Sequence, residues 1–157
     1  MDDSQVVEIL MVEDTPSDAK LAIRALSRHN LTNHIRVVKD GAEALDFLFC
    51  QGQYAERLDR QPKLILLDLN LPKVSGLEVL RQIKENPKTQ KLPVVVLTSS
   101  REDRDLDRCY RLGVNSYIVK PVDFEQFSKA VGEIGLYWVL LNEAPESEIS
   151  RHRSRES

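Results

Sequence analysis

The sequence predicts an α/β protein built on a doubly wound, five-stranded parallel sheet with five flanking helices. Five short segments rich in Val, Ile and Leu recur along the chain, and several of them are continuously apolar. Continuous apolar runs are typical of strands that are covered on both faces, as in a parallel sheet. Segments with helical periodicity separate these runs, so strand and helix alternate in the doubly wound pattern.

The expected strands also predict the strand order. They comprise residues 6–12, 35–38, 64–67, 94–97 and 117–119. The second strand is followed by Lys39-Asp40-Gly41 and, unlike the other four, ends without a candidate site residue. This is what we expect of a strand at the edge of the sheet. A marginal second strand keeps the other four adjacent, and the expected order is therefore 2-1-3-4-5.

Helix start signals precede four of the helical segments. Thr15 is an N-cap candidate, and Pro16 follows it at the first helical position. Cap-plus-three pairs occur at Asp40 and Glu43, at Ser75 and Glu78, and at Asp123 and Gln126. Pro87 cannot continue a helix, so the third helix ends before it. We interpret residues 51–63 as an exposed loop or a frayed extension of the second helix.

Composition excludes several classes of protein. The 157 residues suit one domain, and 22 Lys+Arg against 25 Asp+Glu give a net charge of −3, without the basic footprint of a nucleic-acid binder. Two cysteines, Cys50 and Cys109, form no disulfide framework and fit a reduced cytoplasmic setting. The N-terminus is acidic, and no apolar run approaches the roughly 20 residues of a membrane span. We expect a cytoplasmic protein with neither nucleic-acid nor membrane partners.

The chain divides into a folded domain, residues 1–141, and a polar segment, residues 142–157. The segment begins with acidic residues and proline and ends in an arginine-rich stretch at 151–155. Tails of this composition are usually disordered. A basic contact patch is the alternative interpretation.

Polar residues interrupt the apolar pattern where four of the strands end. Glu13 and Asp14 follow the first strand, Asp68 the third, Thr98 the fourth and Lys120 the fifth. The carboxyl ends of parallel strands line one edge of a sheet, and ligands bind at that edge. The four signals are therefore expected to converge on one pocket.

The chemistry of these residues points to phosphoryl transfer. Three clustered carboxylates repel one another unless a cation neutralises them, and carboxylate oxygens are ligands that Mg²⁺ prefers. Lys120 adds a positive charge and Thr98 a hydroxyl, which completes a cradle for a tetrahedral dianion. A carboxylate can itself act as the nucleophile and form an aspartyl-phosphate. Taken singly, each acid is more often a helix cap or a loop residue than a metal ligand.

The motifs around these positions resemble the receiver domain of two-component response regulators, which has a CheY-like, flavodoxin-like fold. The resemblance covers residues 6–141. It is carried by Val-Glu-Asp at 12–14, Leu-Leu-Asp-Leu-Asn-Leu-Pro at 66–72, Gly76, Leu-Thr-Ser at 97–99 and Val-Lys-Pro at 119–121. The resemblance implies that Asp68 accepts a phosphoryl group from the histidine of a sensor kinase.

The resemblance also assigns roles to the neighbouring residues. It implies that Asp14 and Asp68 bind Mg²⁺ together with the backbone carbonyl of Asn70, while Glu13 acts mainly through a metal-bound water. Thr98 and Lys120 are implied to contact the phosphoryl oxygens.

Two further positions concern the switch between the unphosphorylated and the phosphorylated state. By the same resemblance, Tyr117 is the aromatic switch residue, which turns inward when Thr98 is drawn to the phosphate. The Lys120–Pro121 peptide is implied to be cis. Among receivers, the chain is similar to the single-domain regulators paired with cyanobacterial phytochromes, which implies a phytochrome-type kinase as partner and a protein contact as output.

Three other classes of protein fit the sequence less well. A phosphatase of the haloacid-dehalogenase class needs a second acid two residues after the nucleophile, and Asn70 occupies that position. A flavodoxin-like cofactor module needs a phosphate-binding loop after the first strand, where Glu13 and Asp14 would repel an anion. A degenerate receiver would lack a required residue, and none is missing.

The fifth helix carries more apolar residues than one core-facing stripe needs. The stripe comprises Phe124, Phe127, Val131, Ile134, Trp138 and Leu141. Leu136, Tyr137, Val139 and Leu140 add apolar surface on other faces, and such a surface is usually covered by something else. We expect a homodimer through this helix, and the polar tail folding back over it is the alternative.

Overall fold

The computed structural model describes residues 7–27, 35–57, 60–99 and 103–133. Strand and helix alternate along the chain, with one additional turn of 3-10 helix, η2, after α2. The elements are β1 (Ile9–Val12), α1 (Pro16–Ser27), β2 (Ile35–Val38), α2 (Gly41–Leu48), η2 (Gly52–Tyr54), β3 (Leu64–Asp68), α3 (Gly76–Glu85), β4 (Val94–Thr98), α4 (Asp103–Arg111), β5 (Ser116–Val119) and α5 (Phe124–Glu133).

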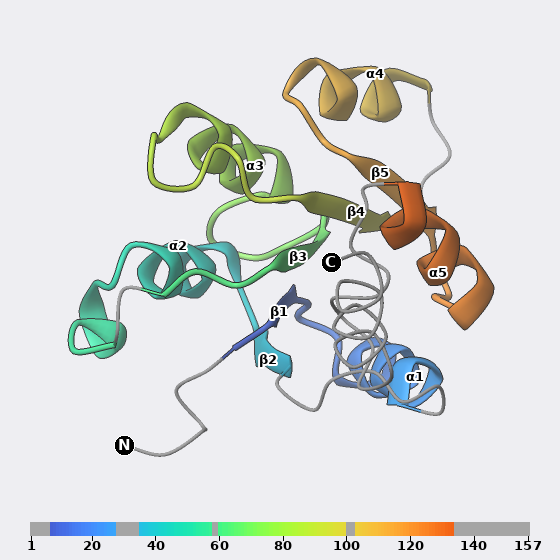
Figure 1. Cartoon of the computed structure of the whole chain (residues 1–157), viewed down its shortest axis with the longest axis horizontal. Coiled ribbons are helices and arrows are strands. Elements are labelled where there is room, and N and C mark those ends of the chain that lie inside the picture. Colours follow the sequence, from blue (N-terminus) through green and yellow to red (C-terminus); the bar gives the residue numbers. More distant parts are fainter. Residues whose placement is uncertain (1–6, 28–34, 58–59, 100–102, 134–157) are drawn as a thin grey trace, which may run out of the picture.

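The five strands form one parallel sheet in the order β2-β1-β3-β4-β5 (Figure 1). The predicted fold class and strand order are confirmed. Every residue of the central strands β1, β3 and β4 is buried, which explains why their sequences are continuously apolar. The marginal strand β2 buries only Val38 fully, and its Arg36 is exposed.

Alternate residues of each strand contribute to two apolar cores on opposite faces of the sheet. Helices α2, α3 and α4 cover one face, and α1 and α5 cover the other (Figure 1). The helices contribute unequally. α3 buries Val79, Leu80 and Ile83, whereas residues 105–111 of α4 bury only Cys109.

The three predicted cap-plus-three pairs form N-terminal hydrogen bonds. The carboxylate of Asp40 accepts from the N–H of Glu43 at 2.7 Å, and the hydroxyl of Ser75 accepts from the N–H of Glu78 at 3.2 Å. Asp123 Oδ1 accepts from the N–H of Gln126 at 2.8 Å. These bonds satisfy backbone donors that the first turn leaves unpaired, and so they explain where α2, α3 and α5 begin.

The connection between α2 and β3 is more tightly packed than the sequence predicts. The Tyr54 ring lies edge-on to Phe47 at 5.1 Å, and its hydroxyl donates to the Glu43 carboxylate at 2.7 Å. The Arg57 guanidinium lies 4.0 Å from the centre of the Phe47 ring, and Arg57 Nε donates to the Phe47 carbonyl at 2.8 Å. The described part of this connection is therefore attached to α2 and is not a simple exposed loop.

The structure extends three predicted strands, including β5, which begins at Ser116, and it shortens another. β3 and β4 include Asp68 and Thr98, which places two predicted site residues within the sheet itself. β1 begins at Ile9, three residues after the predicted start at Val6. The polar tail and the predicted continuation of the fifth helix beyond Glu133 lie outside the described residues.

Gly76 allows α3 to begin directly against the backbone that carries Asp68. A Cβ at position 76 would lie 2.4 Å from the Asp68 carbonyl oxygen and 2.5 Å from Leu69 Cα. Both atoms belong to the backbone and cannot rotate away. The Gly76 N–H also donates to the Leu69 carbonyl at 3.0 Å.

We predict that Gly76→Ala lowers the free energy of unfolding by about 2 kcal/mol, because the methyl group overpacks this contact. Gly132→Ala is the matched control, since a Cβ at that exposed position of α5 meets nothing within 4 Å. The control is expected to be neutral or to stabilise the protein by up to about 1 kcal/mol through higher helix propensity. Urea unfolding of both variants measures the difference, and equal effects would contradict the steric explanation.

Candidate functional site

The predicted site residues meet at the carboxyl edge of the sheet. Because β1, β3, β4 and β5 are neighbours, Glu13, Asp68, Thr98 and Lys120 lie at the ends of adjacent strands. The Lys120 N–H donates to the Thr98 carbonyl at 2.8 Å, which fixes the backbone at the end of β5 against β4.

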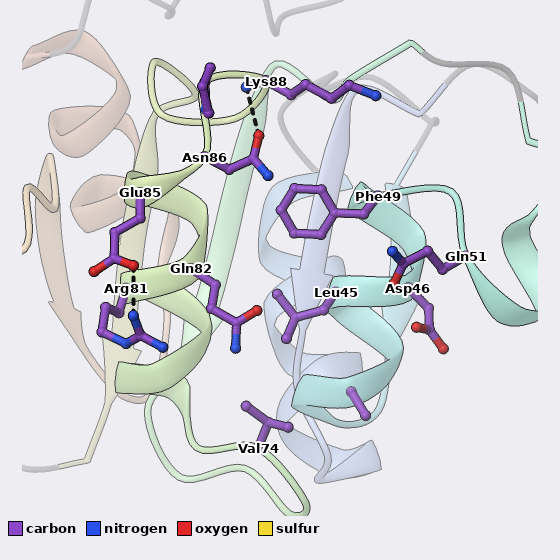
Figure 2. A pocket seen from close by; sticks show the side chains of 12 residues that line it. Leu45, Asp46, Phe49, Gln51, Val74, Arg81, Gln82, Glu85, Asn86 and Lys88 are labelled. Atoms are coloured by element: carbon purple, nitrogen blue, oxygen red, sulfur yellow. Dashed lines mark hydrogen bonds and ion pairs between the residues drawn. The ribbon is translucent and has the colours of Figure 1, made fainter.

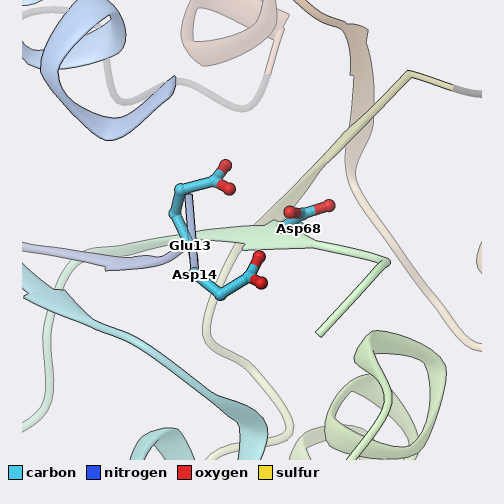
Figure 3. Close-up of side chains that lie close together, drawn as sticks. All are labelled: Glu13, Asp14 and Asp68. Carbon is cyan, nitrogen blue, oxygen red and sulfur yellow. The ribbon is translucent and has the colours of Figure 1, made fainter. Parts of the chain in front are cut away.

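Three carboxylates cluster at this edge. Glu13, Asp14 and Asp68 each offer an oxygen, and these oxygens lie within 4.8 Å of one another (Figure 3). Glu13 and Asp68 are buried, and Asp14 is exposed. The cluster is therefore enclosed on the sheet side and open to solvent at Asp14.

The Lys120 ammonium is the positive charge inside the site. Its Nζ lies 2.8 Å from Glu13 Oε1, 3.0 Å from Asp68 Oδ2 and 3.0 Å from Asp18 Oδ2. The side chains of Glu13 and Asp68 are 2% and 3% exposed, that of Lys120 is 15% exposed, and that of Asp18 is 40% exposed. The ion pairs of Lys120 with Glu13 and Asp68 are therefore screened little by solvent, whereas its pair with Asp18 is partly exposed to solvent.

One ammonium does not balance the charge of the three carboxylates that it contacts. Burial raises the pKa of Glu13 to about 7, the hydrogen bond from Lys120 opposes this rise, and the charge of Asp68 adds to it. Burial by itself would lower the pKa of Lys120, but hydrogen bonds with Glu13, Asp18 and Asp68 raise it above its ordinary value. The site therefore favours an additional positive charge.

The Asp68 carboxylate is held at both oxygens. Oδ1 accepts from the backbone N–H of Asn70 at 3.1 Å, and Oδ2 accepts from Lys120. The Glu13 carboxylate is oriented in the same way, since its Oε2 accepts from the N–H of Thr15 at 3.2 Å. These fixed carboxylate oxygens, with one open side, fit a hard divalent cation such as Mg²⁺.

Thr98 and Tyr117 face the same side of the sheet. The register pairs Val96 with Tyr117 and Thr98 with Val119, and residues two apart along a strand share a face. Thr98 is fully buried, whereas Tyr117 is half-buried beside the core under α4. The Lys120–Pro121 peptide bond that follows is cis, as the resemblance implies.

Asp18 is the site residue that the sequence interpretation missed. Its carboxylate approaches Lys120 from the first turn of α1, across 102 residues of sequence. In the sequence, Asp18 resembles an ordinary acid near a helix N-terminus, where the helix dipole favours negative charge. Only the packing of α1 beside the end of β5 reveals its contact with Lys120.

A larger hollow lies elsewhere on the molecule. A groove of about 910 Å³ separates α2 from α3, with Leu45, Phe49 and Val74 among its apolar residues (Figure 2). It contains none of the clustered carboxylates. We place the chemistry at the smaller acidic site, because that is where charged groups with altered proton affinities converge.

The described residues add neither a cysteine nor a histidine to the site. Cys109 is fully buried, and burial together with the charge of Asp105 raises the pKa of its thiol to about 11, which favours a packing role. Cys50 is half-buried, and the three histidines lie outside the described residues. Among the described residues, no helix is both long and apolar enough to cross a membrane.

The parallel sheet, the acidic cluster and the enclosed lysine define a domain of the phosphoacceptor type found in two-component signalling. Residues 9–132 match the response regulator receiver domain. The chain belongs to this family, as the resemblance predicts.

Similar proteins span almost the same length. The chain is 45% identical over 137 residues to the probable methanogenesis regulatory protein FilR2 of Methanothrix harundinacea, a match that covers 87% of this chain and 86% of FilR2. It is 40% identical over 131 residues to the response regulator Rcp1 of Synechocystis, covering 83% of this chain and 88% of Rcp1.

Solved structures show the same fold. The bacteriophytochrome response regulator AtBRR is 51% identical, with a TM-score of 0.79 and coverage of 88% of this chain and 99% of AtBRR. The Mn²⁺-bound form of Rcp1 has a TM-score of 0.71 at 39% identity, with coverage of 88% of this chain and 98% of Rcp1. The chain is thus related to phytochrome response regulators.

Proposed function

We propose that this chain is a response regulator that receives a phosphoryl group on Asp68 from the phosphohistidine of a sensor kinase. The observation that carries the proposal is the Asp68 carboxylate, held by Lys120 and Asn70 beside two further acids. An Asp68 oxygen attacks the phosphorus, an O–P bond forms, and the N–P bond to the kinase histidine breaks. The electron pair of that bond stays on the imidazole nitrogen. Lys120 stabilises charge on the phosphoryl oxygens.

Asp14, Asp68 and the backbone carbonyl of Asn70 would hold Mg²⁺, with Glu13 acting mainly through water. When bound, the cation offsets the repulsion between the carboxylates and stabilises charge on the transferred phosphoryl group. The close oxygens of the acidic cluster support this assignment, and so does the Mn²⁺-bound structure of the relative Rcp1.

Thr98, Tyr117 and Pro121 would convert phosphorylation into a change of surface. The buried Thr98 hydroxyl moves toward the phosphoryl group, and Tyr117 turns inward to occupy the space that this movement leaves. Their shared face of the sheet and the half-buried position of Tyr117 support the coupling. The output is then a contact with another protein. The domain that makes this contact comprises residues 1–141, and residues 142–157 form a polar tail.

The kinase is proposed to be of the phytochrome type. The likeness to the bacteriophytochrome response regulator AtBRR supports this assignment. The protein itself would not turn over external phosphate esters, because Asn70 stands where a leaving-group acid is needed. It catalyses only its own phosphorylation and dephosphorylation.

We predict that Asp68→Asn abolishes phosphorylation, because an amide oxygen is not a comparable nucleophile. Radiolabelled phosphoryl groups should move from a purified phytochrome-type kinase to the wild type and not to the variant. The phosphate analogue beryllofluoride, with Mg²⁺, should likewise bind only the wild type. Labelling of the variant would show that the acceptor is elsewhere, and transfer only from unrelated kinases in a purified panel would refute the phytochrome-type assignment.

We predict that Asp14→Asn weakens Mg²⁺ binding by about tenfold or more, because few protein ligands remain when one carboxylate is lost. Calorimetric titration with MgCl₂ measures the affinity directly. Asp107→Asn removes a charge from the exposed surface of α4 and should leave the affinity near that of the wild type. An unchanged titration for Asp14→Asn would exclude it as a ligand.

We also propose that the protein is a homodimer through the fifth helix. The support is the apolar surplus at Leu136, Tyr137, Val139 and Leu140, residues that lie outside the described part of the chain. Burying such side chains contributes about 1.5–3 kcal/mol each, which offsets part of the cost of association. Sedimentation at micromolar concentration should show a dimer that Tyr137→Ala and Leu140→Ala weaken. A monomer with and without beryllofluoride would contradict this.

A further inference from the structure

Lys120 is held by one carboxylate that does not belong to the acidic cluster. Its ammonium contacts Asp18 Oδ2 at 3.0 Å, in addition to Glu13 and Asp68. A lysine ammonium has three N–H donors, and these three carboxylates match them in number. The acidic cluster consists of Glu13, Asp14 and Asp68, so Asp18 is outside it.

The other two partners of Lys120 change during the proposed reaction. Asp68 loses its negative charge when one of its oxygens bonds to phosphorus. Glu13 and Asp68 also share their negative charge with a divalent cation at the cluster, which weakens their attraction for the ammonium. Asp18 undergoes neither change. Its attraction for Lys120 therefore persists when that of the other two carboxylates declines.

Among the described residues that line the α1 side of Lys120, none is a substitute for Asp18. A cavity of about 10 Å³ adjoins the ammonium, which is hardly enough for one water molecule. Apart from Glu13, Asp18 and Lys120, the residues that line it are Leu21, Ala22, Leu97, Pro121 and Val122. These side chains are apolar and cannot orient an ammonium group.

We propose that Asp18 is a positioning residue, which keeps the Lys120 ammonium at the phosphorylation site while Asp68 and Glu13 engage the phosphoryl group and the cation. The inference rests on the proposed function, because it concerns the contact between Lys120 and the phosphoryl oxygens. Asp18 acts through Lys120 and does not itself contact the phosphoryl group. Loss of the Asp18 carboxylate therefore weakens binding of a phosphoryl group more than binding of Mg²⁺.

The test is calorimetric titration of the full chain with beryllofluoride at saturating Mg²⁺. Asp18→Ala removes both the charge and the acceptor and should lower the affinity about tenfold, whereas Asp18→Asn keeps an acceptor oxygen and should lower it about threefold. Asp18→Glu restores the carboxylate and should return the affinity to within about twofold of the wild type. Asp107→Ala, on the exposed surface of α4, controls for the loss of one negative charge.

Two further measurements distinguish positioning from a structural effect. The affinity of Asp18→Ala for Mg²⁺ alone should stay within about twofold of the wild type, because Asp18 is outside the cluster. In a Lys120→Met background, Asp18→Ala should cause no further loss of beryllofluoride affinity. If Lys120→Met does not fold, the Asn and Glu variants at position 18 decide the question.

Tighter beryllofluoride binding by Asp18→Ala would overturn the proposal, since Asp18 would then be a competing negative charge. An additional loss in the Lys120→Met background would overturn it as well, because Asp18 would then act independently of Lys120. Failure of the wild type to bind beryllofluoride would instead contradict phosphorylation at Asp68. Different results would therefore contradict the positioning role of Asp18 and the phosphorylation of Asp68.

Discussion

The attraction between one enclosed ammonium and several carboxylates determines the arrangement of the sheet edge. Glu13 and Asp68 are almost fully buried, and an ionised carboxylate in such surroundings requires a charged or hydrogen-bonding partner. Lys120 provides that partner for both. A single positive charge still leaves excess negative charge, and the charge of Asp68 adds to the rise in the pKa of Glu13 that burial causes. This unfavourable charge balance is also what makes an additional positive charge favourable at the site.

Strand pairing and backbone hydrogen bonds fix the backbone around the site, just as ion pairs fix the charged side chains. The parallel register brings the end of β5 beside the end of β4, and Gly76 allows α3 to begin against the carbonyl of Asp68. Backbone N–H groups of Thr15 and Asn70 orient the two buried carboxylates. The geometry of these two acids therefore depends on backbone donors as well as on the Lys120 side chain.

The sequence was sufficient to predict the fold because its signals are local. Continuous apolar runs identify the buried strands, and capping pairs identify where helices begin. The main site residues were also predictable, since parallel topology brings together whatever follows each strand. Asp18 was not predictable in this way, because its partner Lys120 lies in a distant element. The packing of Tyr54 and Arg57 on Phe47 was not predicted for a different reason: the partners are close in sequence, but the polar composition of this connection is typical of an exposed loop.

Few buried side chains pack the described part of α4 against the rest of the domain. Among residues 105–111, only Cys109 is buried, whereas α3 buries three large aliphatic side chains. Local opening of an element costs less free energy when few apolar contacts resist it. Coupling energies between sites are typically about 1–3 kcal/mol, which is comparable with the burial of one or two small side chains. The fold thus combines a well-packed sheet with one weakly packed helix. A modest change of charge at the strand ends is therefore sufficient to displace α4.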